Sequence, residues 1–303
     1  MDYKMFKECI LEGIKERFGE DSQIEYVEVL KNNGIKLDGI LLRKEKGITP
    51  TVYVNDFYDE YEEDLEEIID RIESLIRNNT IREDYDVDSL IEFEKIKDRV
   101  VYKLINFDKN EDLLKTTPHK KFLDLAVVYY ISLDDDCFEQ ASILINNSHL
   151  KLWEKNTDEI DELARYNAPR LLKPELKSMK ETLEEMIRPG CFDEDEEFGD
   201  ELFDDSDDCG MYVLTNEKKL FGASALLYDN VIKDFADKMK SGLYILPSSV
   251  HEVIMVPEKF VNEASMLDDM IVEVNETQVP KVDVLSDHSY YYSIEKGFVS
   301  CAS

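Results

Sequence analysis

An acidic run in the second half of the chain limits most strongly how this sequence can fold. Residues 193–208, DEDEEFGDELFDDSDD, hold eleven acids in sixteen positions and no basic residue. Charges of one sign at this density repel one another, so the run cannot be part of a hydrophobic core. We therefore expect an acidic linker or loop over 191–209, with folded units before and after it.

Residues 1–79 predict an N-terminal α-β-β-β-α unit. Phe6, Ile10 and Ile14 are spaced by four, which places them on one face of a helix. The NNG sequence at 32–34 favours a tight turn between two strands, because Asn and Gly tolerate positive φ. The other predicted elements are strands over 24–30, 35–42 and 51–54 and an acid-rich helix over 56–76.

Residues 80–190 predict a middle α+β unit. The stretch 122–132 contains LDLAVVYYIS, a nearly continuous apolar run that is typical of a strand buried on both faces. Acids after Thr157 favour a helix start there, and Pro169 predicts that this helix ends before it. The other predicted elements are strands over 100–105 and 141–146 and a helix over 174–188.

Residues 210–303 predict a C-terminal β-β-α-β-β-α-β unit. One helix carries Val231, Phe235 and Met239 at four-residue spacing. A strand over 289–294 closes the unit, and its three consecutive tyrosines form either an adhesive edge or a core face. The remaining elements are strands over 211–214, 220–226, 243–246 and 252–256 and a helix around 267–274.

Together these patterns predict an α+β fold of two or three units. We expect mixed or antiparallel sheets with helices packed on one face. Hydrophobic residues make up 43% of the chain, which is enough to build such cores.

The charge balance narrows the choice of partners. The chain has 36 Lys and Arg against 69 Asp and Glu, a formal net charge of −33. Nucleic acids and anionic membranes are bound through clustered cations, so we expect neither as a direct partner. A protein partner is expected instead, and the sequence leaves open whether that partner is basic.

The cysteines and the first residues predict a cytoplasmic protein. The five cysteines are scattered and form no C-x-x-C pair, which favours reduced thiols in a reducing compartment. The start of the chain alternates charged and apolar residues without the apolar core of a signal peptide. No apolar run approaches the roughly 20 residues that a membrane-spanning helix needs.

Several motifs resemble an uncharacterised bacterial family of about this length. They are KNNGIKLDGI, TVYVNDFYDEYEE, PHKKFLDLAVVYYI, GASALLYDNVIKDFADKM, LYILPSSVHEVIMVP and VLSDHSYYY. The family is a domain of unknown function that is common in anaerobic Gram-positive bacteria, and the resemblance covers nearly the whole chain except the acidic run. It implies a bacterial cytosolic protein. It implies no activity, cofactor or catalytic residue, because none is established for the family.

Two short segments of the C-terminal unit hold the residue types used in acyl transfer. There, His takes a proton from Ser while an acid orients the His. The candidate residues are Ser248, Ser249, His251, Glu252, Asp287 and His288. No G-x-S-x-G elbow is present to expose a serine. The alternative is that the two serines complete a turn after Pro247 and that a strand begins at His251.

The sequence predicts no metal and no cofactor. The four histidines show no H-E-x-x-H or H-x-H spacing, and a metal site needs at least three converging ligands. Asp205, Asp207 and Gly210 approach a calcium loop, but Cys209 and Asn216 occupy positions where carboxylates are expected. No glycine-rich phosphate-binding motif occurs.

Three functions remain open. The residues favour a non-enzymatic acidic protein that acts by protein–protein interaction. One alternative is an enzyme of unrecognised type that uses the region of Ser248, His251 and His288. The other is a nucleic-acid mimic in which the acid-rich helix over 56–76 enters the basic groove of another protein.

Overall fold

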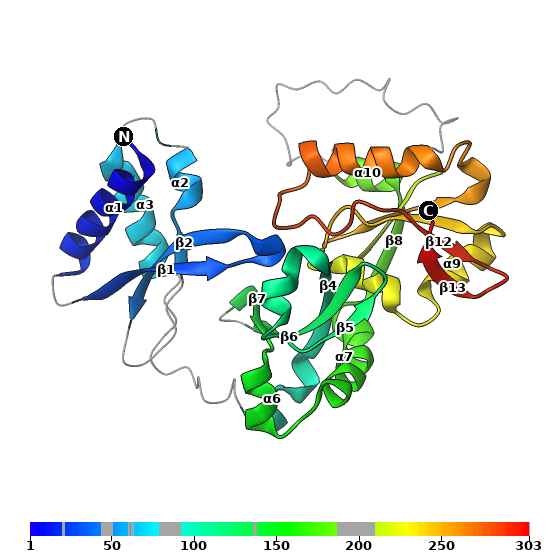
Figure 1. The fold of residues 1–303 in the computed structure, drawn as a ribbon, viewed down its shortest axis with the longest axis horizontal. Helices are drawn as coiled ribbons and strands as arrows, with labels where there is room; N and C mark the ends of the chain where they lie inside the picture. Colours follow the sequence, from blue (N-terminus) through cyan, green and yellow to red (C-terminus); the bar gives the residue numbers. More distant parts are fainter. Residues whose placement is uncertain are drawn as a thin grey trace. The chain divides into compact units, whose positions relative to one another are not determined.

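The computed structural model describes residues 1–19, 22–43, 51–59, 61, 64–78, 92–135, 138–186 and 210–302 (Figure 1). These residues form two compact units, Met1–Ile96 and Lys97–Ser303. The acidic linker predicted at 191–209 lies outside the described residues, and so do the calcium-loop positions Asp205 and Asp207.

The smaller unit consists of helices packed on a three-stranded antiparallel sheet. Its elements are α1 (Tyr3–Phe18), β1 (Gln23–Leu30), η1 (Asn32–Gly34), β2 (Lys36–Arg43), β3 (Thr51–Tyr53), α2 (Asn55–Asp59), α3 (Leu65–Asn78) and α4 (Phe93–Ile96). The strand order is β1-β2-β3. The turn predicted at 32–34 is confirmed as a short 3-10 turn with Asn33 at a φ of 60°.

The acid-rich helix predicted over 56–76 is two helices, α2 and α3. The carboxylate of Asp64 accepts the N–H of Glu67 at 3.1 Å, and such a cap starts a new helix. Ile72 and Ile76 of α3 are fully buried in one core with Phe6 and Ile10 of α1. Each apolar side chain buried in this way stabilises the unit by about 1.5–3 kcal/mol.

The first sheet of the larger unit is built around one long central strand. The elements of this region are η3 (Lys97–Arg99), β4 (Val100–Asn106), η4 (Asp108–Asn110), α5 (Glu111–Leu114), β5 (His119–Phe122), β6 (Leu125–Asp135), β7 (Phe138–Leu144), α6 (Asn147–Trp153) and α7 (Thr157–Leu171). β4 pairs with one side of β6, while β5 and β7 pair with the other side. Residues 125–131 are each at most 1% exposed, so the predicted strand buried on both faces is confirmed.

Two predictions for the middle of the chain are wrong at their ends. α7 continues through Pro169 to Leu171, because a proline in the last turn removes only one of the helix hydrogen bonds. The helix predicted over 174–188 begins as a strand, β8 (Pro174–Ser178), and only then becomes α8 (Met179–Met186). Pairing of β8 with a distant strand overrides the local helix preference.

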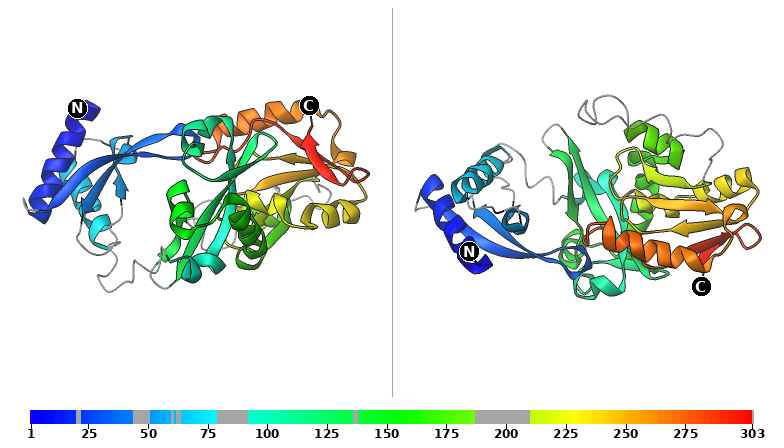
Figure 2. Two further views of the ribbon diagram at one scale, coloured as in Figure 1. Left: turned by 60° about the horizontal axis from the view of Figure 1, so that its bottom comes forward. Right: turned by 90° about the horizontal axis from the view of Figure 1, so that it is seen from above.

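The second sheet of the larger unit has six strands, all paired antiparallel. Its further elements are β9 (Tyr212–Asn216), η6 (Gly222–Leu227), α9 (Val231–Met239), β10 (Leu243–Leu246), β11 (Val253–Pro257), η7 (Glu258–Phe260), α10 (Ser265–Thr277), β12 (Tyr290–Ser293) and β13 (Phe298–Cys301). The strand order is β13-β12-β10-β11-β9-β8. In Figure 1, α10, in orange, and α8, in green behind it, both lie above these strands, and the right view of Figure 2 shows the two helices from above.

The strand predicted over 220–226 is wrong, because this segment forms the 3-10 turns of η6. Gly222 explains the difference. A side chain there would meet the hydroxyl of Thr215 and the backbone of His251, so the chain passes this point only as glycine. Phe221 precedes it at a φ of 52°, a left-handed value that ends any extended pairing.

The middle and C-terminal stretches of the larger unit are joined by backbone and side-chain bonds. β8 pairs with β9 over five residue pairs, from Pro174 with Asn216 to Ser178 with Tyr212. The Tyr102 hydroxyl donates to the backbone oxygen of Ser224 at 3.3 Å. Both stretches belong to one compact unit, Lys97–Ser303. Whether each would also fold as a separate unit stays a prediction.

The predicted fold class is confirmed. The protein is α+β, and every strand pairing of the described residues is antiparallel. Within residues 1–302, no helix of the described ranges is both long and apolar enough to cross a membrane.

A buried carboxylate fastens α7 to the first sheet of the larger unit. The side chain of Asp161 is 7% exposed and accepts hydrogen bonds from Lys120 at 2.9 Å, Arg165 at 2.9 Å and the Tyr129 hydroxyl at 3.0 Å. Burial alone would raise the pKa of Asp161. The hydrogen bonds from Lys120 and Arg165 outweigh burial and hold this pKa below its usual value.

Replacing Asp161 with alanine should lower the free energy of unfolding of the larger unit by about 2–3 kcal/mol, because two cations and a buried hydroxyl lose their acceptor. Urea unfolding followed by the fluorescence of Trp153, the single tryptophan, measures this change. Asp158→Ala is the matched control. Asp158 binds the same Lys120 ammonium but is 82% exposed, so its loss should cost less than about 0.5 kcal/mol. Equal losses for the two variants would contradict the assignment.

Candidate functional site

The two candidate serines follow β10 and precede β11 along the chain, and their backbone pairs with a third segment. The backbone oxygen of Ser248 accepts the N–H of Leu285 at 2.9 Å, and Ser249 forms a bridge with Val284. Ser248 and Ser249 are 8% and 5% exposed. The Ser249 hydroxyl accepts the backbone N–H of His251 at 3.0 Å, as expected for a serine that completes a turn.

The ring of His251 is held by partners that the sequence did not indicate. Its Nδ1 lies 3.3 Å from the backbone N–H of Phe221, and its Nε2 lies 3.5 Å from a carboxylate oxygen of Asp283. The ring also stacks on the Phe221 ring, with 5.7 Å between centroids. Both ring nitrogens therefore face protein groups, and neither is directed at a serine hydroxyl as a general base must be.

Charge around this ring changes its proton affinity. The hydrogen bond with Asp283 raises the pKa of His251 above its ordinary value, although burial acts in the opposite direction. The neighbouring carboxylate of Glu252, on a half-buried residue, adds to the same effect. The arrangement is therefore an ion pair when the ring is protonated.

The other candidate pair, Asp287 and His288, forms a different set of contacts. Asp287 accepts hydrogen bonds from Lys109 at 2.9 Å and from the Asn275 amide at 2.8 Å. Burial would raise the pKa of Asp287, but the Lys109 hydrogen bond outweighs it and lowers that pKa. His288 is exposed, and its backbone N–H donates to the Ser286 hydroxyl at 3.0 Å.

A hydrogen-bonded triplet next to this pair joins distant parts of the larger unit. Asp124, in the turn before β6, accepts the Ser286 hydroxyl at 2.6 Å and the Tyr290 hydroxyl at 2.5 Å. Ser286 and Tyr290 are fully buried. Sequence reasoning missed Asp124, and the one available signal was a single acid inside the apolar run at 122–132.

The structure separates the two candidate histidines. Ser249 is paired with Val284, and Ile245 is paired with Tyr290, so His251 lies beyond the Ser249 end of this antiparallel stretch, while His288 lies several residues further along it, near Tyr290. Within the part of the chain that the structure describes, no group of three His, Cys, Asp or Glu side chains is placed to hold a metal ion.

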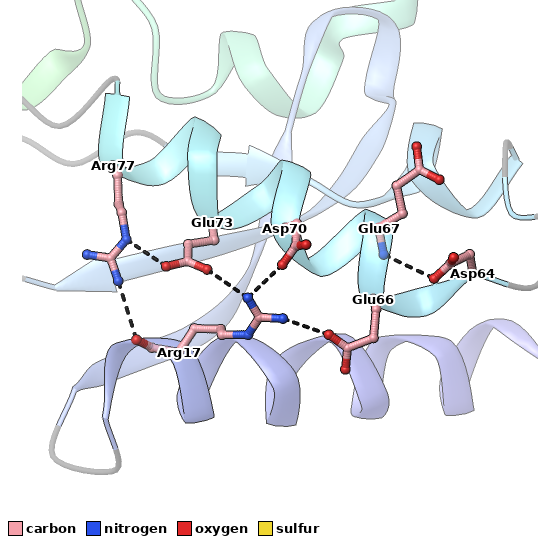
Figure 3. Close-up of polar contacts among 7 residues, drawn as sticks. All are labelled: Arg17, Asp64, Glu66, Glu67, Asp70, Glu73 and Arg77. Carbon is pink, nitrogen blue, oxygen red and sulfur yellow. Dashed lines mark hydrogen bonds and ion pairs between the residues drawn. The ribbon is translucent and has the colours of Figure 1, made fainter.

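Three carboxylates of the acid-rich α3 in the smaller unit contact one guanidinium, whereas the Glu67 side chain points away from it (Figure 3). Arg17 of α1 contacts Glu66 and Asp70 at 2.6 Å each and Glu73 at 3.3 Å. Arg77 also contacts Glu73 at 2.7 Å. These acids converge on a point between α1 and α3 and do not form rows like those of a phosphate backbone.

An open pocket of about 470 Å³ lies in the larger unit beside the edge of the six-stranded sheet. One wall comes from η6 and the start of α9, with Leu226, Tyr228 and Ile232. The opposite wall is the hairpin of β12 and β13, with Tyr292 and Val299. The walls combine apolar and aromatic side chains with the polar groups of Asp229, Asn230, Lys233 and Asp237, and pockets that bind partner side chains use such a combination.

The walls of the pocket are fixed by contacts behind them. The hydroxyl of Tyr228 donates to the backbone oxygen of Leu172 at 3.0 Å, and burial raises the pKa of Tyr228 to about 12. Of the two alternatives for the tyrosine-rich strand, the structure shows a core face, since Tyr290 and Tyr292 are 0% and 6% exposed. One edge of the sheet is β13 and the other is β8.

The rim of the pocket combines exposed apolar side chains with negative charge. Ile294 and Phe298 are 42% and 54% exposed. Lys233 and Asp237 pair with each other at 2.6 Å. The exposed carboxylate of Asp229 makes no hydrogen bond or ion pair with another described residue.

Comparison with known proteins identifies the family of the chain. A model of a family of unknown function, DUF5688, matches residues 3–294, so the chain belongs to that family. No curated protein and no solved structure matches the chain.

Replacing His251 with glutamine should destabilise the larger unit more at low pH than at high pH. The folded pKa of His251 is raised, so its ion pair with Asp283 is fully formed below the unfolded pKa and is lost as pH rises through the folded pKa. We expect a loss of about 1 kcal/mol near pH 5.5 and a smaller loss near pH 8.5 in urea unfolding followed by Trp153 fluorescence. His288→Gln removes an exposed imidazole and should cost less stability than His251→Gln near pH 5.5. An equal loss at both pH values for His251→Gln would contradict the ion pair.

Proposed function

We propose that this member of the DUF5688 family acts by binding another protein, and that the pocket between α9 and the hairpin of β12 and β13 receives a basic segment of that partner. The observation that carries the proposal is the pair of exposed apolar side chains at the pocket, Ile294 and Phe298. Exposed apolar groups that are contiguous with a pocket and have a polar rim are typical of interaction sites.

The charge of the chain supports a basic partner. A net charge of −33 attracts cationic surfaces over a long range and raises their rate of association. At the pocket itself, Asp229 offers a carboxylate that no described residue neutralises, while the charge of Lys233 is matched by Asp237. A Lys or Arg of the partner next to an apolar anchor would complement this rim.

The two alternatives have less support. The enzyme alternative needs a serine and a histidine that act on each other, whereas the ring of His251 faces Phe221 and Asp283. The mimic alternative needs free acids in rows, whereas Glu66, Asp70 and Glu73 share Arg17. Neither arrangement favours these functions over protein binding.

The setting that we propose is the bacterial cytoplasm. The resemblance to a bacterial family supports it. Cys9 and Cys301 carry free thiols, which fits a reducing compartment. A basic partner of the same compartment is then accessible to the pocket.

Binding of a short labelled peptide tests the proposal. The peptide alternates lysine with valine around a central phenylalanine, and fluorescence anisotropy measures its affinity for the full chain. Phe298→Asp should weaken binding about tenfold or more, because an anchor contact is typically worth more than 1 kcal/mol. Tyr166→Asp is the matched control, since it adds the same charge at an aromatic residue of α7 that is 65% exposed. It should change the affinity less than about twofold.

Two further peptides separate specific binding from general attraction to an acidic protein. Exchange of every lysine for glutamate should abolish binding, and exchange of the central phenylalanine for alanine should weaken it as much as Phe298→Asp does. Equal weakening by Phe298→Asp and Tyr166→Asp would overturn the proposal, because binding would then follow net charge and not the pocket. No binding of the basic peptide at low salt would also overturn it.

A further inference from the structure

We infer that the partner segment binds in extended form, as an additional strand paired with β13. This inference rests on the proposed function, because it concerns the same pocket and the same basic segment. It adds the conformation of the bound segment and the backbone groups that recognise it. Binding by strand addition takes its affinity from main-chain hydrogen bonds and its selectivity from pockets that receive alternate side chains.

The position of β13 in its sheet supplies the open edge. Among the described strands, β13 is the last in the order β13-β12-β10-β11-β9-β8 and pairs with β12 alone. It is short, Phe298–Cys301, as exposed edge strands usually are. An exposed edge strand carries unpaired N–H and C=O groups that another chain can use.

The hydrogen-bond pattern shows which backbone groups face this edge. The N–H of Ala302 donates to the backbone oxygen of Ser289 at 3.0 Å, so these two residues form a bonded pair. Bonded and non-bonded pairs alternate along an antiparallel ladder. Counting back from Ala302, Ser300 bonds to β12, while Val299 and Cys301 direct their N–H and C=O groups away from β12.

The register also connects this edge to the pocket. Leu243, Tyr292 and Val299 lie opposite one another on neighbouring strands, so their side chains form one row on the same face of the sheet. Tyr292 and Val299 both line the pocket. A strand added beside β13 lies about 4.8 Å further along this row, and its residue opposite Val299 points to the side of the sheet that holds the pocket.

Charge selects a basic segment over a second copy of this chain. Two copies would bring net charges of −33 each to one edge, and this repulsion opposes self-association. A segment with lysine or arginine at the positions that do not enter the pocket is instead attracted by the anionic body of the protein. The apolar anchor then fills the space between Tyr228 and Tyr292.

A proline substitution on the edge tests the backbone contacts. Cys301→Pro removes an N–H that faces outward, and proline is tolerated at such positions of edge strands because the pairing with β12 does not use that N–H. We expect the alternating lysine–valine peptide with central phenylalanine to bind Cys301→Pro at least about tenfold more weakly than wild type. Cys301→Ala keeps the N–H and removes the thiol, so it should bind the peptide within about twofold of wild type. Equal affinities of Cys301→Pro and Cys301→Ala would overturn the inference.

A modified peptide gives a second test that needs no variant of the protein. N-methylation of alternate peptide backbone nitrogens removes the donors on one edge of an extended strand. In one of the two possible registers of methylation, binding should fall at least about tenfold, and in the other it should be nearly unchanged.

The outcomes separate the two proposals. Full binding of both methylated peptides, with the loss on Phe298→Asp retained, would overturn strand addition and leave the pocket as the binding site. Absence of any binding by the unmodified peptide would overturn the proposed function and the inference together. A wild-type dimer in analytical ultracentrifugation that Cys301→Pro converts to a monomer would assign the edge to a second copy and overturn the inference of a basic partner.

Discussion

The pairing of β8 with β9 is the interaction on which the larger unit depends. It connects Pro174–Ser178 to Tyr212–Asn216, so residues on either side of the acidic run belong to one sheet. The first sheet is thereby tied to the second, and Asp124 can reach Ser286 and Tyr290. The pairing also helps to fix one wall of the pocket, because Leu172, whose backbone oxygen accepts the Tyr228 hydroxyl, lies two residues before β8.

Much of the fold follows from local patterns in the sequence, and the exceptions have physical causes. The apolar run of β6 and the four-residue spacing of Phe6, Ile10 and Ile14 predict elements that are found, because burial of a face or of a whole strand imposes its period on the sequence. The predictions for residues 174–178 and 220–226 are wrong because groups that are distant in the sequence decide the conformation of these segments. The first segment adds to a sheet, and the second lies so close to Thr215 and the backbone of His251 that only glycine fits at position 222.

The candidate site is less visible in the sequence than the fold. Ser249 and His251 lie close together, yet the groups that hold the ring of His251 are Phe221 and Asp283, each about 30 residues away along the chain. The pocket combines residues of 226–237 with residues of 292–299, and no local spacing links these segments. Contacts of this kind depend on strand order, which hydrophobic periodicity does not encode.

In the binding mode that we propose, one property of the chain, its negative charge, acts both against self-pairing of the β13 edge and in favour of a basic segment. An open edge strand is a hazard in any sheet protein, because identical edges pair with one another. Mutual repulsion of strongly anionic bodies opposes that pairing, while the same field draws in a cationic segment. Screening weakens both effects as salt increases, but the backbone hydrogen bonds that we propose for Val299 and Cys301 would be short-range and affected far less. The proposal therefore assigns selection of the arriving segment to the charge, and retention of the bound segment to the edge and the pocket.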